Sequence, residues 1–341
     1  MDFAFTPEQL SFRDSVRALL RRECTPARVR DAWSREDGRV PGLWEALAEL
    51  GVPGMLAPEV DGGLGMTDLD LVLLLEEHGR FAAPEPVTDT AAVAVPLLRE
   101  VGGAASERWL RPVAAGAIGV ALGLAGAPFV AGADAARLLL LESDGEVHAL
   151  EHTEVTLEPQ PSVDGARRLS RVTWTPSAST RIAAGPVSLR ALADARDRAA
   201  VGTAAELIGL ARQMLDVTVA HAKTRHQFGK PIGSFQAVKH HLADALIAVE
   251  MAAPSVYRAA YSLAHAARDR SVHASMAKAL ASDAAWLTAR KALQCHGAIG
   301  YAFEGDLHLW MKRTWALATA WGDAASHRAR VAATLFAAGG V

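Results

Sequence analysis

Apolar residues recur at helical spacing through about the first hundred residues of the chain. The first predicted helix begins with the capping box Thr6-Pro7-Glu8-Gln9, which has proline at its first helical position and is followed by apolar residues at Phe12, Val16, Leu19 and Leu20. A second helix is predicted over about Pro41 to Leu50, because Gly51 is suited to the left-handed conformation that ends helices. A third begins at Thr67-Asp68-Leu69-Asp70 and ends at His78-Gly79.

The pattern changes from roughly Gly116 to Ile182. Short runs with β-type residues are separated by Asp, Gly and Pro, at 137–141, 147–150, 153–157 and 169–174. These runs predict a small β domain of about five or six strands.

Helical periodicity returns after Pro186 and continues to the end, with helices predicted near 187–223, 233–269, 272–296, 306–320 and 324–338. Pro254 lies inside the second of these and predicts a kink. Long amphipathic helices in succession favour a bundle. We therefore expect an α+β fold that is mainly α, with an N-terminal helical domain (1–112), a small β domain (113–184) and a C-terminal helix bundle (185–341).

Composition places the chain among ordinary globular proteins: 50% of its 341 residues are hydrophobic and 21% are charged. A net charge of −3 gives no electrostatic case for nucleic-acid binding. Two cysteines, Cys24 and Cys295, are too few for a disulfide framework, and no secretory signal or membrane-length apolar stretch is visible. We expect a cytoplasmic protein without membrane insertion. His221, His240 and His241 lack a metal-binding spacing, so no metal site is expected.

The stretch from Arg225 to Gln236, RHQFGKPIGSFQ, joins two of the long helices and suggests a cofactor with phosphates and a ring system. A guanidinium group pairs well with a pyrophosphate, and glycines let the backbone come close to a ligand. Phe228 or Phe235 can lie against a ring. The alternative from these residues alone is a loop arginine that hydrogen-bonds to helix-end carbonyls.

This stretch resembles the Arg-x-x-Phe-Gly segment of the acyl-CoA dehydrogenase family. Further resemblances lie in the N-terminal part (Phe5 to Gln9, Leu47 to Gly51, Gly62 to Gly65, Glu77 to Arg80) and in Gln294-Cys295-His296-Gly297-Ala298-Ile299-Gly300-Tyr301. The order of helices, small β domain and helix bundle is also that of the family, so the resemblance covers essentially the whole chain. It implies FAD as cofactor, an acyl-CoA substrate, an electron-transfer acceptor and an oligomer.

In the family, residues matching these two segments contact FAD and mostly reach the flavin of a neighbouring subunit. Carried over to this sequence, the resemblance implies cofactor contacts from Arg225, Gln227, Phe228, Phe235, Gln236, Gln294, Gly297 and Ala298. Ala298 replaces a glycine that is usual in the family, and its methyl group would crowd the approach slightly.

The carboxylate that family members use as the base is missing from both positions where the resemblance would place it. One position falls on Trp321 and the other, in the helix before Arg225, on Ala199. Asp323 is a weak candidate substitute, and Glu206 is another acid in that helix. The β domain also departs from the family, because residues 121–130 lack a Glu-Pro loop and the domain is short. We expect its grip on the flavin ring to be weak or absent.

Three functional hypotheses follow. The first is a half-site subunit of an acyl-CoA dehydrogenase, which lends FAD contacts to a homologous catalytic chain in a heterotetramer, as in members that desaturate steroid side-chain thioesters. The second is a self-sufficient homodimer or homotetramer whose base is Asp323 or Glu206. The third is a scaffold or binding protein without redox chemistry. The sequence does not identify the acyl group, its chain length, the electron acceptor or the stoichiometry.

Overall fold

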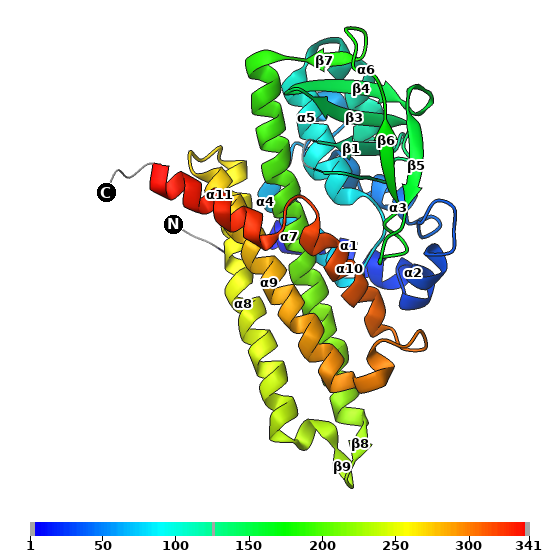
Figure 1. The fold of residues 1–341 in the computed structure, drawn as a ribbon, viewed down its shortest axis with the longest axis vertical. Helices are drawn as coiled ribbons and strands as arrows, with labels where there is room; N and C mark the ends of the chain where they lie inside the picture. Colours follow the sequence, from blue (N-terminus) through cyan, green and yellow to red (C-terminus); the bar gives the residue numbers. More distant parts are fainter. Residues whose placement is uncertain (1–3, 125–126, 338–341) are drawn as a thin grey trace.

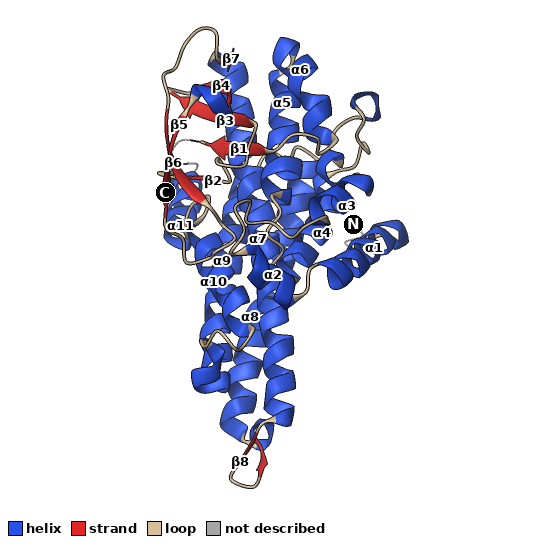
Figure 2. Ribbon diagram, turned by 90° about the vertical axis from the view of Figure 1, so that its right-hand side faces the viewer, coloured by secondary structure: helices blue, strands red, loops and turns tan. Residues whose placement is uncertain are grey.

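The structure is a computed structural model that describes residues 4–124 and 127–337. Figures 1 and 2 show a long helical bundle with a small β domain beside one end of it and a short hairpin at the other end. The expected mainly α architecture, with N-terminal helices, a small β domain and a C-terminal bundle, is confirmed.

The N-terminal part is helical. Its elements are α1 (Pro7–Glu23), α2 (Pro26–Ala32), α3 (Leu43–Glu49), α4 (Asp68–Arg80), the π-helical segment η3 (Thr88–Ala94), α5 (Val95–Val101) and α6 (Gly103–Ala114), with short 3-10 turns η1 (Val52–Gly54) and η2 (Glu59–Asp61). The predicted capping box is present, since the Gln9 amide donates to the Thr6 hydroxyl at 3.3 Å and the Thr6 amide donates to the Gln9 side chain at 2.9 Å. Gly51, at φ 75°, follows the end of α3 as predicted.

Seven strands form two sheets in the described part of the β domain. One sheet has the order β1-β3-β4-β7, built from β1 (Val120–Gly123), β3 (Leu138–Ser143), β4 (Glu146–Glu151) and β7 (Arg181–Ala183). The other has the order β2-β6-β5, built from β2 (Val130–Ala131), β6 (Leu169–Thr173) and β5 (Thr156–Gln160). Among the strands of residues 4–124 and 127–337, only β1 and β3 pair in parallel.

Strand β3 ties the β domain to the helices. Its four leucines are all buried, but successive side chains point to opposite faces. Leu138 and Leu140 belong to the main core with the helices, whereas Leu139 and Leu141 pack in a second apolar cluster with Val130. The sequence analysis gave five or six strands and missed β1, β2 and β7, which are only two to four residues long.

The C-terminal bundle is built around the long helix α7 (Gly185–Thr224), which runs from the β domain to the hairpin (Figure 1). The other helices are α8 (Gln236–Ala264), α9 (Arg270–His296), α10 (Leu307–Thr319) and α11 (Ala324–Ala337). All five expected helices are present within about five residues of their predicted ends. Pro254 lies inside α8, which continues on both sides of it; the kink expected there stays a prediction.

Helices α4 and α7 cross at very short range. A Cβ atom added to Gly79 would lie 2.0 Å from the backbone oxygen of Glu206, and one added to Gly209 would lie 1.8 Å from that of Glu76. Both positions therefore require glycine. The crossing brings the side chains of α4 against the middle of α7, where several candidate site residues lie.

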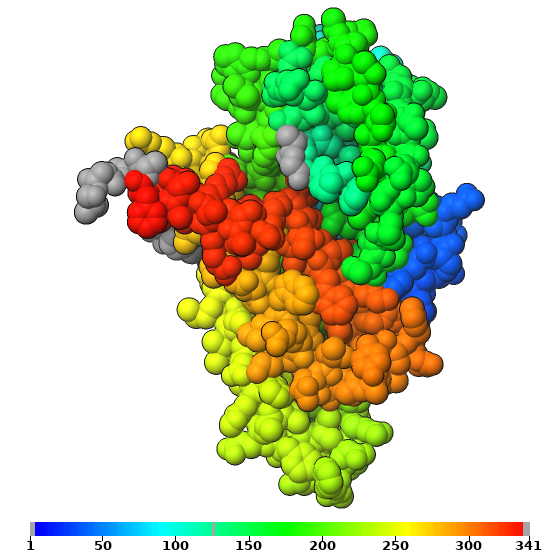
Figure 3. All heavy atoms as spheres, in the orientation of Figure 1, coloured from blue at the N-terminus to red at the C-terminus, as the bar shows by residue number. Residues whose placement is uncertain are grey.

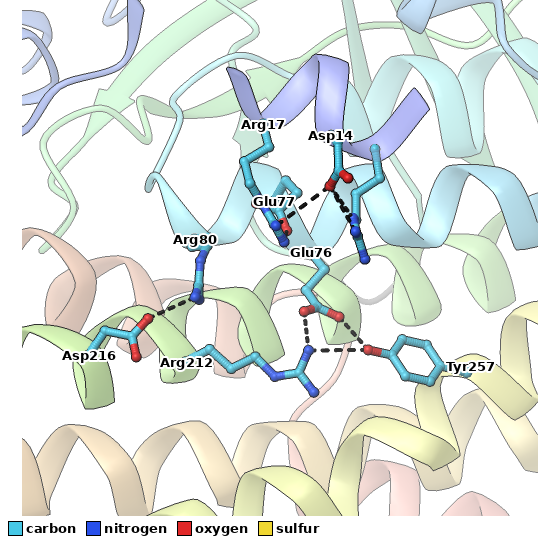
Figure 4. Close-up of polar contacts among 9 residues, drawn as sticks. Asp14, Arg17, Glu76, Glu77, Arg80, Arg212, Asp216 and Tyr257 are labelled. Atoms are coloured by element: carbon cyan, nitrogen blue, oxygen red, sulfur yellow. Dashed lines mark hydrogen bonds and ion pairs between the residues drawn. The ribbon is translucent and has the colours of Figure 1, made fainter. Parts of the chain in front are cut away.

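Polar contacts around Glu76 and Glu77 fix α4 to its neighbours, as Figure 4 shows. The buried Glu76 carboxylate accepts hydrogen bonds from Arg212 of α7 and from the Tyr257 hydroxyl of α8, the latter at 2.6 Å. The next carboxylate, Glu77, accepts from Arg17 of α1. These groups are structural, because they join four helices and line none of the cavities described below.

None of the helices in residues 4–124 and 127–337 is both long and apolar enough to cross a membrane.

Candidate functional site

The segment from Arg225 onward forms the hairpin at the tip of the bundle (Figures 1 and 2). Strands β8 (His226–Gln227) and β9 (Lys230–Pro231) pair across a two-residue turn. Both turn residues have positive φ, 53° for Phe228 and 77° for Gly229, as the tight turns of β-hairpins require. Glycine accepts this conformation freely, but a phenylalanine there is strained by about 1 kcal/mol.

Side chains of the hairpin point away from the body of the molecule. Arg225 and Gln227 are exposed, and the Phe228 ring is 92% exposed, with its edge toward Phe235 at a centroid distance of 6.1 Å. Among the described residues, the Arg225 guanidinium has no hydrogen bond or ion pair, which disfavours the interpretation that it satisfies helix-end carbonyls. A free guanidinium and a free aromatic ring can bind a phosphate-bearing planar ligand supplied from outside this chain.

The second predicted segment lies at the same end of the bundle. Helix α9 ends at His296, whose ring stacks on that of His221 in α7 at a centroid distance of 4.3 Å. Gln294, Gly297 and Ala298 are all exposed there. Because His221 comes one turn before Arg225, the stacking places this segment beside the base of the hairpin. Gln236, at the start of α8, is exposed as well.

A cavity of about 560 Å³ lies between the β domain and the last two helices, on the side of the molecule that Figure 3 shows. Apolar side chains from the β domain form one wall: Leu122, Leu124, Phe129 and Leu169. The loop between α10 and α11 and the start of α11 form the other, with Trp321, His327 and Arg330. Its volume is typical of small-molecule sites, which span about 300–1,000 Å³.

Trp321 lines this cavity and also a smaller adjoining one. It has φ 57°, and Gly322 follows with φ 96°. The fully buried Lys278 stabilises this loop, because its Nζ donates to the backbone oxygens of Ala318 at 3.0 Å and of Gly322 at 2.9 Å. Burial lowers the pKa of Lys278 to about 7. The position where the resemblance puts a base is thus occupied by an indole, which cannot accept a proton.

Asp323 is exposed and caps α11, because its carboxylate accepts a hydrogen bond from the Ser326 amide at 2.8 Å. That contact lowers the pKa of Asp323, and the residue lines neither cavity. Ala199 is fully buried in α7 and offers no polar atom. Neither position supplies a base in this structure.

Glu206 is buried at the smaller cavity, which has a volume of about 100 Å³. Its carboxylate accepts a hydrogen bond from the Thr88 hydroxyl, and His78 Nδ1 lies 3.7 Å away. Burial acts to raise the pKa of Glu206, but His78 and Thr88 outweigh it, so that the pKa is lowered. The carboxylate is thereby held as an anion inside the protein.

Asp89, which the sequence analysis did not single out, lines both cavities together with Arg167. Burial raises the pKa of Asp89 to about 6. Among the described residues its carboxylate has no hydrogen-bond partner, and the Arg167 guanidinium donates only to the Ala316 backbone oxygen, at 2.9 Å. The signal that could have identified it is that Asp89 is the one charged residue in the sequence from Val87 to Leu98.

The sequence analysis noted that residues 121–130 lack the Glu-Pro loop of the family. Residues 125 and 126 of this stretch lie outside the described residues. No group of three or more His, Cys, Asp or Glu side chains able to hold a metal ion occurs in the described ranges. Cys24 and Cys295 are both free and buried there.

Comparisons with known proteins agree with this architecture. Residues 6–117 match the acyl-CoA dehydrogenase N-terminal domain, and residues 189–336 match the acyl-CoA dehydrogenase C-terminal domain. The acyl-CoA dehydrogenase IpdE2 of Mycolicibacterium smegmatis is 34% identical over 96% of this chain and 99% of its own length. IpdE2 of Mycobacterium tuberculosis is 31% identical over 90% of each chain.

Solved structures share the fold. The ChsE4-ChsE5 complex of Mycobacterium tuberculosis matches with a TM-score of 0.86 at 22% identity, covering 98% of this chain and 99% of that one. Butyryl-CoA dehydrogenase of Megasphaera elsdenii matches with a TM-score of 0.87 at 21% identity, covering 98% and 100%. The chain therefore belongs to the acyl-CoA dehydrogenase family of FAD-dependent oxidoreductases.

Proposed function

We propose that this chain is a half-site subunit of an FAD-dependent acyl-CoA dehydrogenase. It lends cofactor contacts to a homologous catalytic chain that desaturates an acyl-CoA thioester between its α and β carbons. The observation that carries the proposal is a division within the molecule. Groups suited to a dinucleotide are exposed at the tip of the bundle, whereas the loop where a base is expected holds Trp321.

The hairpin fits the dinucleotide part of FAD. Arg225 would pair with the pyrophosphate, Phe228 and Phe235 would lie against a ring, and the side chains of Gln227, Gln236 and Gln294 would donate or accept hydrogen bonds. The open backbone at Gly297 would accept a close approach, since a Cβ atom there would meet nothing within 4 Å. When bound, FAD supplies the hydride acceptor of the reaction.

These groups cannot serve the cavity inside their own chain, because the hairpin and the β domain lie at opposite ends of the long helix α7 (Figure 1). A non-glycine residue in the left-handed conformation with an exposed aromatic ring is unfavourable in the isolated chain, and such residues gather at ligand and partner sites. We infer that a second subunit covers the tip and that the flavin lies between the two.

The reaction needs a base to remove the proton α to the thioester. Asp323 is an exposed helix cap, Ala199 has no polar side chain, and Glu206 is already bonded to Thr88. The partner chain would therefore supply the base. Two further observations favour a partner that is homologous. One structure that shares this fold is a complex of two differently named chains, ChsE4 and ChsE5, and the IpdE2 relative matches over nearly its whole length.

The experiment is to purify this chain alone and together with a homologous candidate partner, and to compare flavin absorbance and acyl-CoA oxidation. We expect flavin and activity only in the assembled complex. In that complex, Arg225→Ala should release the flavin. Arg268→Ala is the matched control, because Arg268 is exposed in the loop at the opposite end of α8. Yellow, active protein from this chain by itself would refute the proposal.

A second candidate function is a self-sufficient homodimer or homotetramer. Glu206 favours it, since this carboxylate lines the smaller cavity. Glu206→Gln would then abolish flavin reduction by acyl-CoA in the chain alone. A complex with no flavin absorbance at all would instead favour the scaffold function. For the half-site subunit, we also propose a cytoplasmic location and an electron-transfer acceptor, as expected from the sequence.

A further inference from the structure

Two buried side chains at the smaller cavity have polar atoms without a hydrogen bond. His78 is only 3% exposed, and neither of its ring nitrogens has a hydrogen bond within the described ranges. Glu85 is 2% exposed; its Oε1 accepts from the Val40 amide at 3.0 Å, but its Oε2 has no partner. Buried polar atoms in proteins are nearly always hydrogen-bonded. Two such side chains facing one cavity indicate that something polar completes their bonding.

The charges around this cavity balance. Its carboxyl groups are Asp37, Glu85, Asp89 and Glu206, and its guanidinium groups are Arg39, Arg167, Arg168 and Arg313. The four carboxyl groups and the four guanidinium groups balance in formal charge, and the His78 ring lies 3.7 Å from the Glu206 carboxylate. An anionic ligand would therefore bring an uncompensated charge into a buried site, which is costly.

A neutral hydroxyl suits this lining better. A hydroxyl donates one hydrogen bond and accepts others, and the cavity offers both partners. Glu85 Oε2 and the unbonded carboxylate of Asp89 can accept, while His78 and Arg167 can donate. A keto oxygen would use the donors alone.

The polar cavity is the end of a larger space. Asp89, Ala131, Arg167 and Trp321 line both cavities, so the two adjoin. The larger one, of about 560 Å³, has one wall of leucine and phenylalanine side chains that is suited to hydrocarbon, whereas Arg196, His327 and Arg330 line other parts of it. The smaller one, of about 100 Å³, has room for about three water molecules at about 30 Å³ each, or for one polar group on a ligand.

We propose that this chain binds an acyl-CoA whose acyl group ends in a neutral hydroxyl or keto oxygen. The hydrocarbon body lies in the larger cavity, and the terminal oxygen lies in the smaller one between His78, Glu85 and Asp89. This inference rests on the proposed function for its ligand class, an acyl-CoA thioester, but it does not require turnover by this chain.

The test is calorimetric titration of the purified chain with three thioesters of equal length. They are octanoyl-CoA, ω-hydroxyoctanoyl-CoA and the mono-CoA thioester of octanedioic acid. We expect the hydroxyl compound to bind about tenfold or more tightly than octanoyl-CoA, as a hydrogen bond to charged groups provides, and the carboxylate compound to bind most weakly.

Two variants test whether the preference for the hydroxyl depends on the smaller cavity. Asp89→Ala and Glu85→Gln should each abolish the preference for the hydroxyl, because each removes an acceptor from the smaller cavity. Glu85→Gln should also leave octanoyl-CoA binding within about twofold, because Glu85 does not line the larger cavity. Glu304→Gln, at an exposed residue outside both cavities, is the matched control. Circular dichroism spectra confirm that each variant is folded.

Several results would overturn the inference. They are equal binding of the octanoyl and hydroxyoctanoyl compounds, tightest binding of the carboxylate compound, a preference that survives both substitutions, or no binding of any thioester. None of these bears on the proposed half-site role, which is judged separately by flavin retention in the assembled complex with Arg225→Ala. Hydroxyl preference without flavin in that complex would support this inference and refute the half-site role.

Discussion

Lys278 provides a quantitative test of how the Trp321 loop is held. Its ammonium group is fully buried in α9 and donates to the Ser282 hydroxyl at 3.2 Å and to two backbone oxygens at the ends of the loop. Burial lowers its pKa from 10.5 to about 7. A difference of this size corresponds to about 5 kcal/mol between the two protonation states.

The sign of the pH effect follows from proton counting. Between pH of about 7 and 10.5, the unfolded chain keeps the Lys278 proton while the folded chain releases it. The free energy of unfolding therefore rises with pH across this window. Between pH 7 and 9 the rise due to this one group is about 2 kcal/mol, from the linkage relation.

Lys278→Met removes the titrating group and keeps an unbranched side chain of similar length. Urea unfolding of the wild-type chain and the variant at a series of pH values gives the difference in the free energy of unfolding. We expect this difference to shift in favour of the wild type by about 2 kcal/mol from pH 7 to 9. Lys291→Met, at a partly exposed lysine of the same helix, controls for the loss of a lysine side chain. A difference that stays flat with pH would show that the three oxygen acceptors keep Lys278 charged in both states.

Three further predictions concern the fold and the tip. Gly79→Ala should lower the melting temperature by several degrees, because its Cβ would lie 2.0 Å from the Glu206 oxygen; an unchanged melting temperature would contradict the close crossing. Glu76→Gln should cost about 2–3 kcal/mol in urea unfolding and Tyr257→Phe only about 1 kcal/mol, because the first removes the charge that pairs with the partly exposed Arg212 and the second removes one hydrogen bond; equal losses would contradict this assignment. Phe228→Gly should relieve backbone strain and leave the melting temperature unchanged or higher, yet lower the flavin content of the assembled complex; full flavin retention would argue against a role for the ring.

The helices were predictable because their signals are local. Periodic apolar residues and caps such as Thr6 lie within the helix that they define, and α7 to α11 match the predicted ranges closely. Strands β1, β2 and β7 were missed because two to four residues carry too little pattern. Strand β1 also pairs in parallel with β3, a contact between residues about twenty positions apart that no local pattern reveals.

The hairpin could be recognised from the sequence because all of its chemistry lies within one short segment, Arg225 to Gln236. The cavities could not, since they are assembled from residues far apart, such as Asp89, Arg167 and Trp321. Lys278 shows the same limit. A lysine in a helix is usually exposed, and only the packing of α10 over α9 encloses this one.

The central claim is that this polypeptide contributes to a flavin site at its bundle tip but has no proton acceptor of its own for the dehydrogenation. Anaerobic mixing with acyl-CoA, followed by flavin absorbance, tests it most directly. With FAD added, the chain alone should show no bleaching, whereas the complex with its catalytic partner should bleach. Rapid bleaching by the chain alone would contradict the claim.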